Sequence, residues 1–357
     1  MDRIQTLNQN LLEKLSYALS ATRSAGYLIQ NISLPFVEML ATRNRKARDP
    51  EFKSHIKIII KELDALLKRD VHNIAQGLYP FEVLASLAPL SSLGKYALVV
   101  EDAFGIARRK NARQTKEFST EAQGFMDDVP EYYQRNFHFQ TDGYLSEKSA
   151  KLYEYQVEIL FGGAANPMRR LLIPSLRQFV AERSGDKIDG AGMHFLEIGA
   201  GTGALTKFVK MTFPQARVTV LDLSDPYLGI ARENLKKFSK LNFVQGDAEN
   251  LPFPNETFDG IYSCFLFHEL PLEVRKKVIA EGLRVLKPEG YYGMVDSIQT
   301  GDNMNLDWAI QRFPIDFHEP FFKNYIDTPM EDLLTNCGVK NVENDQGFFS
   351  KAVFGTK

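Results

Sequence analysis

The stretch HFLEIGAGTGAL, which runs from His194 to Leu205, constrains the fold more than any other part of this 357-residue chain. A short apolar run ends in a turn that contains Gly199, Gly201 and Gly203, and a helical pattern follows the turn. Glycines at such a turn permit backbone torsions that other residues avoid, and they let a ligand approach the main chain closely. The stretch therefore predicts a strand, a ligand-binding turn and a helix, in that order.

This turn is compatible with two nucleotide-like ligands. The pattern G-x-G-x-x-A, formed by Gly199, Gly201 and Ala204, is that of a dinucleotide-binding turn. The pattern E-x-G-x-G-x-G, formed by Glu197 and the three glycines, is that of a protein that binds S-adenosylmethionine (SAM). The turn alone leaves this choice open, and residues further along the chain must decide it.

From residue 193 onward, segments with strand character alternate with segments of helical character. Five strands are expected, at 193–199, 216–223, 241–248, 258–267 and 291–298. Such an alternation predicts an α/β domain with a mostly parallel sheet. The tail can add a hairpin of two further strands, at 339–342 and 351–354.

The chain before this domain is expected to be helical. Near the N-terminus, apolar residues recur at helical spacing at Ile4, Leu7, Leu11, Leu12, Leu15 and Leu19. The least polar segment, 81–100, is interrupted by Glu82, Pro89 and Lys95, so we expect buried helices there and no membrane span. The predicted domains are a helical domain at 1–118, an aromatic-rich cap or connector at 119–190, and a third domain at 191–357.

The composition excludes several function classes. With a net charge of −2, nothing in the overall charge indicates a nucleic-acid or acidic partner. The basic runs at 43–48 and 107–113 lack interleaved aromatic residues, so we interpret them as solvated helix ends. Cys264 and Cys337 are too few for a disulfide framework, and no secretory or transit signal is visible, so a cytoplasmic location is expected.

Two acidic residues close successive strands. Asp222 ends the second strand about 20 residues after the glycine turn, where a Rossmann-type fold places a carboxylate that accepts from ribose hydroxyls. The alternative is a helix cap, but Asp225 or Ser224 suits that role better. Asp247 closes the third strand, where it would accept from an adenine amino group while Ala248 leaves room for the ring. The alternative for Asp247 is an acid in a turn.

Four segments together resemble class I SAM-dependent methyltransferases: FLEIGAGTGALT, VTVLDLS, FVQGDAENLPFPNETFDGIYSCFLFHEL and VLKPEGYYGMVD. The resemblance covers residues 191–300 and is greatest to the group that includes the ubiquinone/menaquinone-biosynthesis methyltransferases. It implies a Rossmann-like sheet of seven strands with a final antiparallel strand. Because nicotinamide-dependent dehydrogenases lack the DAENLPFPNETFD segment and the LKPEG turn, the resemblance favours SAM as the cofactor. The small members of the family lack an N-terminal helical domain such as this one.

The resemblance also implies which residues contact SAM. They are Gly199, Gly201 and Gly203 behind the methionine part, Glu197 at its amino group, Ser263 and Phe265 below the sulfonium, Asp222 at the ribose, and Leu223, Asp247 and Ala248 at the adenine.

Methyl transfer from a sulfonium is an in-line displacement that requires alignment and exclusion of water, with a general base when the nucleophile is an oxygen of high pKa. His268 follows the fourth strand at the ligand-binding edge of the sheet and is a candidate base, although a structural histidine is the alternative. Asp296 ends the fifth strand and is a second catalytic candidate, which we expect to point into the cleft. No metal site is expected, because the pair His268–Glu269 lacks a third ligand at a recognisable spacing.

Other segments are candidates to cover the substrate. The segment DFHEPFFKNY supplies His318, Glu319 and Tyr325 after the fifth strand. Residues 151–172 resemble the lid of the quinone methyltransferases, in which Tyr153 or Tyr155 would replace the tyrosine of the lid. An aromatic block would pack on a sulfonium or a flat substrate, or would form a small core between two domains: Tyr132, Tyr133, Phe137, His138, Phe139 and Tyr144.

The first hypothesis is a SAM-dependent methyltransferase that acts on a small aromatic or hydrophobic acceptor. A second is a SAM-binding protein whose N-terminal helices are a protein-interaction module, and a third is a nicotinamide-dependent dehydrogenase. The expected partner is a small-molecule acceptor, without nucleic acid or a membrane span. The N-terminal helices are a candidate surface for a homodimer or another protein.

Overall fold

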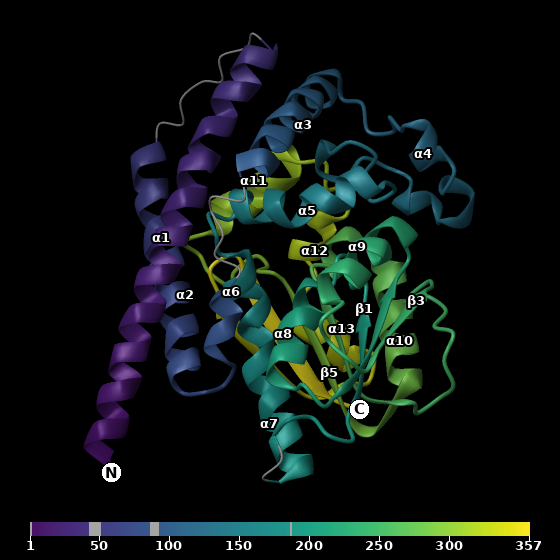
Figure 1. Cartoon of the computed structure of the whole chain (residues 1–357). Coiled ribbons are helices and arrows are strands. Elements are labelled where there is room, and N and C mark those ends of the chain that lie inside the picture. The colour runs from purple at the N-terminus through teal and green to yellow at the C-terminus, as the bar shows by residue number, and fades with distance from the viewer. Residues whose placement is uncertain (1, 43–50, 86–92, 186–187) are drawn as a thin grey trace.

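The computed structural model describes residues 2–42, 51–85, 93–185 and 188–357, and its centre is a sheet of seven strands (Figure 1). The strands are β1 His194–Ile198, β2 Arg217–Asp222, β3 Leu241–Gln245, β4 Phe258–Cys264, β5 Leu286–Ser297, β6 Lys340–Gly347 and β7 Ser350–Thr356. They lie in the order β3-β2-β1-β4-β5-β7-β6. The pairs among β1 to β5 are parallel, and β7 is antiparallel to both of its neighbours. The predicted α/β fold with a closing hairpin is therefore confirmed.

The fifth strand begins earlier than the sequence indicates. We expected a turn at 287–290 before a strand at 291–298, but β5 already begins at Leu286. Leu286 pairs with Phe258 of β4, and the register shifts before the next pair, Gly260 with Tyr291. Glu289, with a φ of 59°, lies within this irregular stretch, so the expected turn is an interruption inside the strand.

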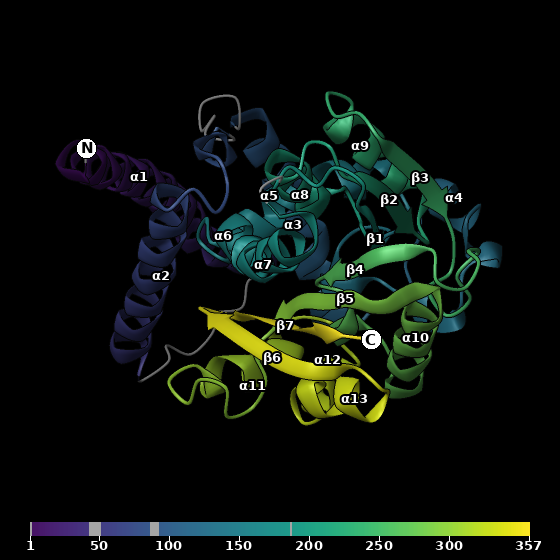
Figure 2. The ribbon, with the colours of Figure 1, turned by 90° about the horizontal axis from the view of Figure 1, so that it is seen from below.

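Helices cover both faces of the sheet (Figure 2). One face packs against α7 Ile173–Ser184, α8 Ala204–Thr212 and α9 Asp225–Leu235, and the other against α10 Leu272–Val285, α12 Phe322–Ile326 and α13 Met330–Asn336. The alternation of side chains along β1 explains this arrangement, because Phe195 joins the first core and Leu196 the second. The helix α11 Asp307–Asp316 follows β5.

The described part of the chain before β1 contains helices and no strand, as predicted. Its α-helices are α1 Asp2–Thr42, α2 Phe52–Ala75, α3 Leu93–Ala112, α4 Thr120–Gln123, α5 Glu147–Leu160 and α6 Ala165–Arg169, besides α7. Single turns of 3-10 helix link them at η1 Phe81–Leu84, η2 Met126–Asp128, η3 Glu131–Tyr133, η4 Phe137–Phe139 and η5 Arg170–Leu172. The basic run at 43–48 and the proline at 89 lie outside the described residues.

The buried core does not stop at the predicted boundary of the helical domain. Leu66 of α2 and Leu172 of η5 belong to the same apolar cluster as Phe195 of β1. The division at residue 118 therefore stays a prediction about the chain, while the packing is continuous across it. No described helix is long and apolar enough to cross a membrane.

A buried ion pair fastens α2 to the segment in front of α7. Arg170 donates from Nε and Nη2 to the two carboxylate oxygens of Asp70, at 2.8 and 2.6 Å, and both side chains are almost fully buried. Tyr79 donates a further hydrogen bond to Asp70, and the ring of Phe208 lies 4.8 Å from the guanidinium. A bidentate pair fixes the relative position of its two side chains. Removal of one partner leaves a buried charge uncompensated.

We therefore expect Asp70→Asn to lower the free energy of unfolding by about 3–5 kcal/mol, because Arg170 would keep its charge without a counterion. Urea denaturation followed by circular dichroism measures this change. The matched control is Glu273→Gln, which removes the partner of exposed Lys276 and should cost less than about 1 kcal/mol. Equal effects of the two substitutions would contradict the role of the buried pair.

Candidate active site

The glycine turn lies between β1 and α8, at the carboxyl edge of the sheet. Gly201 has a φ of 55°, and its N–H donates to Oδ2 of Asp222 at 2.7 Å. A side chain at Gly201 would have open space, with its nearest neighbour, in the ring of Tyr227, 3.9 Å away. A side chain at Gly203 would meet Leu235 of α9 at 2.6 Å, so this glycine serves close helix packing. The turn therefore presents bare backbone on one side and packs tightly on the other.

Asp222 stands at the end of β2, beside this turn. Its second oxygen accepts from the N–H of Ser224 at 2.8 Å, so backbone donors hold both carboxylate oxygens in place. Burial raises the pKa of Asp222 to about 6, although these backbone hydrogen bonds lower it. Ser224, and not Asp222, caps α9 through its side chain. Asp222 is thus a fixed acceptor at the rim of a cavity, with lone pairs left for a ligand.

Glu197 is an almost fully buried acid at this edge. It accepts a hydrogen bond from the hydroxyl of Thr206, and burial raises its pKa to about 8. Its carboxyl group nonetheless lines the same cavity as Asp222. A buried carboxyl group of this kind gains most from a cationic partner, such as an amino group.

The cavity that these residues border has a floor of residues that follow the ends of β1 to β4 and a roof of aromatic residues. On the floor lie Gly199, Gly201, Leu223, Asp247, Ala248 and Phe265, all of which the sequence assigned to SAM. On the roof lie Tyr132, Tyr133, Tyr144 and Tyr153, which come from the connector. Tyr144 and Tyr153 also pack edge-to-face on each other and on Tyr227. The aromatic block is therefore both a small core and a wall of the cavity.

Two further residues of this cavity have no role in the sequence-based assignment. Nη1 of Arg169 lies 2.9 Å from a carboxylate oxygen of Glu154, and the other oxygen of Glu154 accepts from Thr202 of the glycine turn at 2.7 Å. The guanidinium of Arg169 also lies 5.3 Å from the ring centre of Phe265. These residues place a fixed positive charge at the methionine end of the expected SAM position. The likeness of 151–172 to a lid was the one signal that pointed to them.

Of the two lid tyrosines that the sequence offered, the structure brings Tyr153 to the site. Tyr155 instead turns to α1, where its hydroxyl donates to Gln30. Tyr153 lines the cavity beside the glycine turn, which we call the cofactor cavity because the sequence assigns its residues to SAM. It also lines two adjoining cavities. The larger of these, of about 410 Å³, lies among α1, α3, α5 and α11 and is mostly apolar. The smaller shares Phe265 with the cofactor cavity and His138 with the larger one, so the three cavities adjoin.

His268, in η6 Phe267–Glu269, lines the smaller apolar cavity. Its Nδ1 lies 2.6 Å from Oδ1 of Asp296, and the other oxygen of Asp296 accepts from the N–H of Phe267 at 2.8 Å. Burial lowers the pKa of His268, but the nearby carboxylate of Asp296 outweighs it and raises the pKa to about 9. Contrary to our expectation, Asp296 is fully buried and lines none of the three cavities. It lies behind His268 and orients the ring.

A second histidine–carboxylate pair approaches from the connector. Nδ1 of His138 lies 2.9 Å from Glu319, and its Nε2 lies 3.5 Å from the carboxylate of Glu269. Nε2 of His268 lies 3.8 Å from the same oxygen of Glu269, which also accepts from the hydroxyl of Tyr144. Burial lowers the pKa of His138, but the two carboxylates raise it to about 10. The pair Glu269 and Glu319 is thus neutralised within an ion-pair network.

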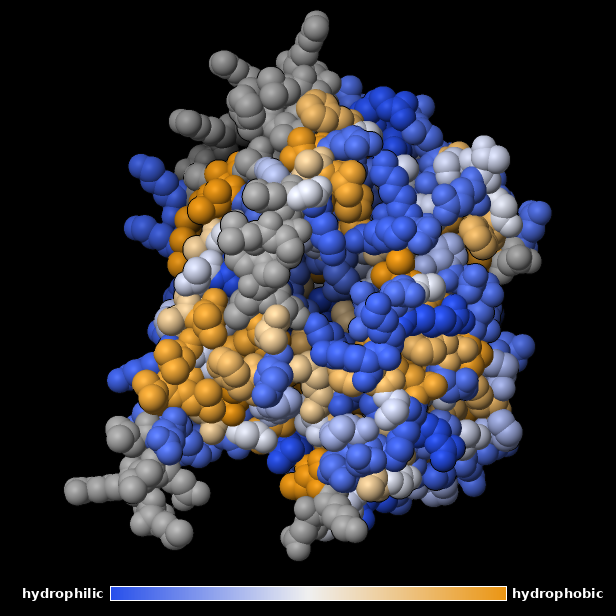
Figure 3. Space-filling model, in the orientation of Figure 1, coloured by the Kyte–Doolittle hydropathy of each residue, from blue (hydrophilic) through white to orange (hydrophobic). Residues whose placement is uncertain are grey.

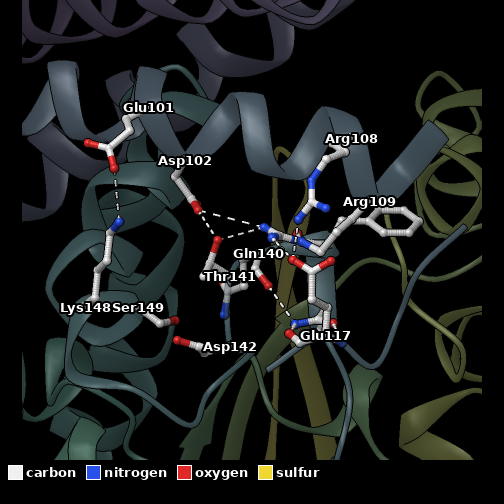
Figure 4. Close-up of polar contacts among 12 residues, drawn as sticks. Glu101, Asp102, Arg108, Arg109, Glu117, Gln140, Thr141, Asp142, Lys148 and Ser149 are labelled. Carbon is white, nitrogen blue, oxygen red and sulfur yellow. Dashed lines mark hydrogen bonds and ion pairs between the residues drawn. The ribbon is translucent and has the colours of Figure 1, made fainter. Parts of the chain in front are cut away.

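The segment that carries His138 is held by α3 (Figure 4). Arg109 donates from Nε to the carbonyl of Phe139 and from Nη2 to the hydroxyl of Thr141, both at 2.8 Å. Thr141 in turn donates to Asp102, which also accepts from Gln156 of α5. The backbone of His138 has a φ of 54°, which other contacts must enforce. The basic run at 107–113, which we interpreted as a solvated helix end, is therefore solvated only in part, because Arg109 belongs to a buried network.

Some predicted residues lie apart from the cavities. Ser263 is buried in β4 and does not line the cofactor cavity, and Gly203 faces α9. Tyr325 is fully buried and donates to the carbonyl of Ser297, so it holds the end of β5. His318 lies against the ring of Phe139. Of His318, Glu319 and Tyr325, the one that pairs with a residue lining the apolar cavities is Glu319, through His138.

Comparison with known proteins agrees with this geometry. Residues 195–290 match a family model described as a methyltransferase domain. The chain contains a class I SAM-dependent methyltransferase domain. SAM is the cofactor of this domain, and the glycine turn, Asp222 and the buried acid Glu197 suit it. The match leaves the helices before β1 outside the family model.

Curated relatives of the methyltransferase domain act on different acceptors. A phthiotriol/phenolphthiotriol dimycocerosates methyltransferase from Mycobacterium tuberculosis is 33% identical over 32% of this chain and 41% of its own length. A fatty-acid O-methyltransferase from Mycolicibacterium smegmatis is 36% identical over 36% of this chain and 45% of its own. A ubiquinone/menaquinone biosynthesis C-methyltransferase from Shewanella pealeana is 36% identical over 32% of this chain and 45% of its own.

The chain thus spans less than half the length of these relatives. Among solved structures, a SAM-dependent methyltransferase from Aquifex aeolicus has 21% identity and a TM-score of 0.39, with 57% of this chain and 97% of that chain covered.

We expect Asp222→Ala to weaken the binding of S-adenosylhomocysteine at least about 100-fold, because two hydrogen bonds from ribose hydroxyls to a charged acceptor are lost. Titration calorimetry measures the affinity, and Asp222→Asn separates the loss of charge from the loss of shape. Asp225→Ala removes an exposed acid three residues away and serves as the control. An unchanged affinity in Asp222→Ala would refute the ribose assignment.

Proposed function

We propose that this protein transfers the methyl group of SAM to a hydrophobic small molecule. The observation that carries the proposal is the row of three adjoining cavities, of which one borders the glycine turn and two are apolar. The volume of the larger apolar cavity, about 410 Å³, lies in the range of small-molecule sites. Its walls come from the helical region before β1 and from α11, which would thereby select the acceptor.

In this proposal the two ends of SAM bind at opposite ends of the cofactor cavity. At one end Asp222 accepts from the ribose, and Leu223, Asp247 and Ala248 contact the adenine. At the other end the carboxyl group of Glu197 accepts from the amino group, and Arg169, held by Glu154, faces the carboxylate. SAM bound in this way supplies an electrophilic methyl group. Phe265 and Tyr153, which line both the cofactor cavity and the smaller apolar cavity, mark where donor and acceptor meet.

The acceptor class follows from the lining of the apolar cavities. Both cavities are bordered by Val157, Leu160 and Phe317. An apolar chain or ring would therefore be buried there without removing many polar groups from water. The named relatives act on dimycocerosates, fatty acids and quinones, which are all apolar molecules with an oxygen-bearing group. We infer an acceptor of this kind, with its reacting group at His268.

His268 is the proposed proton acceptor for the reacting group. Its Nδ1 is engaged by Asp296, so its Nε2, which lies 3.8 Å from Glu269, is the ring atom that would accept the proton. Asp296 acts through His268, because it lines none of the cavities, and we assign it a positioning role. His268 must be neutral to accept a proton, and its raised pKa therefore sets the pH at which the reaction is fastest.

Incubation with SAM labelled in the methyl group and a lipid-rich cell extract would identify the acceptor. We expect label in an extractable apolar molecule. Label that appears only in protein or in polar metabolites would contradict the proposed acceptor class.

Ala103→Phe should raise the KM for the acceptor by about tenfold or more. Ala103 of α3 lines the larger apolar cavity, and a phenyl ring at this position would fill part of the cavity. The affinity for S-adenosylhomocysteine should not change. Ala112→Phe, on the exposed end of the same helix, is the control. An unchanged KM in Ala103→Phe would place the acceptor elsewhere.

The rate of the chemical step should rise with pH up to about 9, since the neutral form of His268 appears as its raised pKa is passed. Asp296→Asn removes the charge that raises this pKa, so the rise should move to lower pH while the maximal rate falls. His268→Ala should lose about 10²–10⁴-fold in rate. Single-turnover rates between pH 6 and 10 measure these effects, and a flat profile in the unchanged protein would exclude His268 as the base.

The second candidate function is protein interaction through the N-terminal helices. The observation in its favour is the exposed apolar face of α1, where Ile29 and Ile32 are 70% and 68% exposed. This face lies outside the matched methyltransferase domain, so both functions are compatible in one chain.

A further inference from the structure

The apolar stripe at the start of the sequence faces solvent. Leu11, Leu15 and Leu19, which the sequence marks as one face of a helix, are 57%, 53% and 40% exposed, and Ile29 and Ile32 continue this face. In Figure 3 apolar side chains lie along the left side of the molecule, where α1 runs in Figure 1. A helix normally turns its apolar stripe toward the core. Here a substantial part of that stripe is left without a cover in the described chain.

The contacts of α1 with its own chain fix this orientation. Nη2 of Arg23 lies 2.6 Å from Glu158 of α5, and Asn31 donates to the carbonyls of Ile159 and Leu160 at 2.9 and 3.1 Å. These polar residues, together with buried serines, form the inner face: Ser16, Ser20 and Ser24. Because Arg23 and Asn31 bind α5 and Ser24 donates to the carbonyl of Gly162 after it, α1 cannot rotate its leucines inward without losing these contacts.

A set of the exposed residues, which excludes Leu19, follows a heptad. Going along the helix, outward-facing positions recur at alternating intervals of four and three residues: Leu11, Leu15, Ala18, Thr22, Ala25, Ile29 and Ile32. This is the spacing of the a and d positions in a coiled coil, which pack against a second helix. The stretch of 22 residues corresponds to about 33 Å of helix, or three heptads. This face is therefore suited to pack along a second helix and not against the rounded surface of a globular domain.

The charge of this face limits the kind of partner. Between Leu15 and Ile32 the sequence contains one charged residue, Arg23, and that residue is turned inward to Glu158. Helices that lie on membranes carry several lysines and arginines beside the apolar face, and between Leu11 and Ile32 the basic residues are only Lys14 and Arg23. A partner of opposite charge has nothing to recognise here. A second apolar helix of the same pattern satisfies the face without leaving a charge buried.

We propose that this stripe pairs with the same stripe of a second copy of the chain to form a two-fold symmetric dimer. A symmetric contact uses one patch twice, so the heptad of α1 is sufficient for both sides. The small residues Ala18, Thr22 and Ala25 at its centre let the two helices approach closely, and the leucines and isoleucines at its ends enclose them. Because α1 lies at the edge of the molecule (Figures 1 and 2), the second copy meets α1 without displacing the sheet.

The pairing has a consequence for the acceptor cavity. Asn31 lines the larger apolar cavity, next to the exposed Ile32, and α1 contacts both α3 and α5 along that wall. A second copy on the outer face would hold α1 against this wall. The dimer does not depend on the proposed methyl transfer, and its test needs no substrate.

Sedimentation equilibrium tests the proposal directly. The full chain should have twice its monomer mass of 40.5 kDa at micromolar concentration. Leu15→Glu combined with Ile29→Glu should give a mass of 40.5 kDa, with an unchanged circular dichroism spectrum because both residues are exposed. Ile315→Glu, at an apolar residue on α11 that is 78% exposed, is the matched control and should remain a dimer. A monomeric unchanged chain, or a double variant that stays dimeric, would overturn the proposal.

A cysteine at the centre of the stripe provides a second readout. Thr22→Cys should form a disulfide-linked dimer under mild oxidation, since position 22 faces its own equivalent in either direction of pairing. The unchanged chain, with only Cys264 and Cys337, and the variant Ile315→Cys should not cross-link. Cross-linking of all three to the same extent, or of none, would contradict a specific contact through α1.

Discussion

Tyr144 fastens the helical part of the chain to the carboxyl edge of the sheet, and the whole site depends on that attachment. Its hydroxyl donates to Glu269, its carbonyl accepts from Ser224 at 2.7 Å, and its ring packs on Tyr153 and Tyr227. The parallel strands end at one open edge, where a ligand would be exposed to water. The tyrosine roof closes that edge, so in the proposed function the edge of the sheet would supply the contacts to SAM and the roof would exclude solvent.

The geometry separates two tasks between two parts of the chain. The glycine turn, Asp222 and Glu197 come from the segment that matches the methyltransferase domain. The larger apolar cavity is lined by α1, α3, α5 and α11, of which the first three precede that domain. His138 bridges the two parts, because it leaves the connector and reaches Glu269 beside His268. In the proposed function, the acceptor would thus contact residues that lie outside the matched segment 195–290.

The sequence was sufficient for the fold and for the floor of the site, because those features are local. A strand, three glycines and an acid one strand later determine the turn and the position of Asp222 from short-range pattern alone. Arg169 with Glu154, and His138 with Glu319, depend on contacts between distant segments, and no periodicity encodes them. For α1, the spacing of Leu11, Leu15 and Leu19 showed that one face is apolar. It contained no information on whether the same chain covers that face.

A crystal structure of the full chain with S-adenosylhomocysteine tests the central claim most directly. The account predicts the ribose at Asp222, the adenine between Leu223 and Ala248, and the sulfur beside Phe265 and Tyr153, pointing toward the apolar cavity that His268 lines. The roof tyrosines should cover the bound molecule. Density for the ligand outside this cavity, or with its sulfur directed away from Tyr153 and His268, would contradict the proposed meeting point of donor and acceptor.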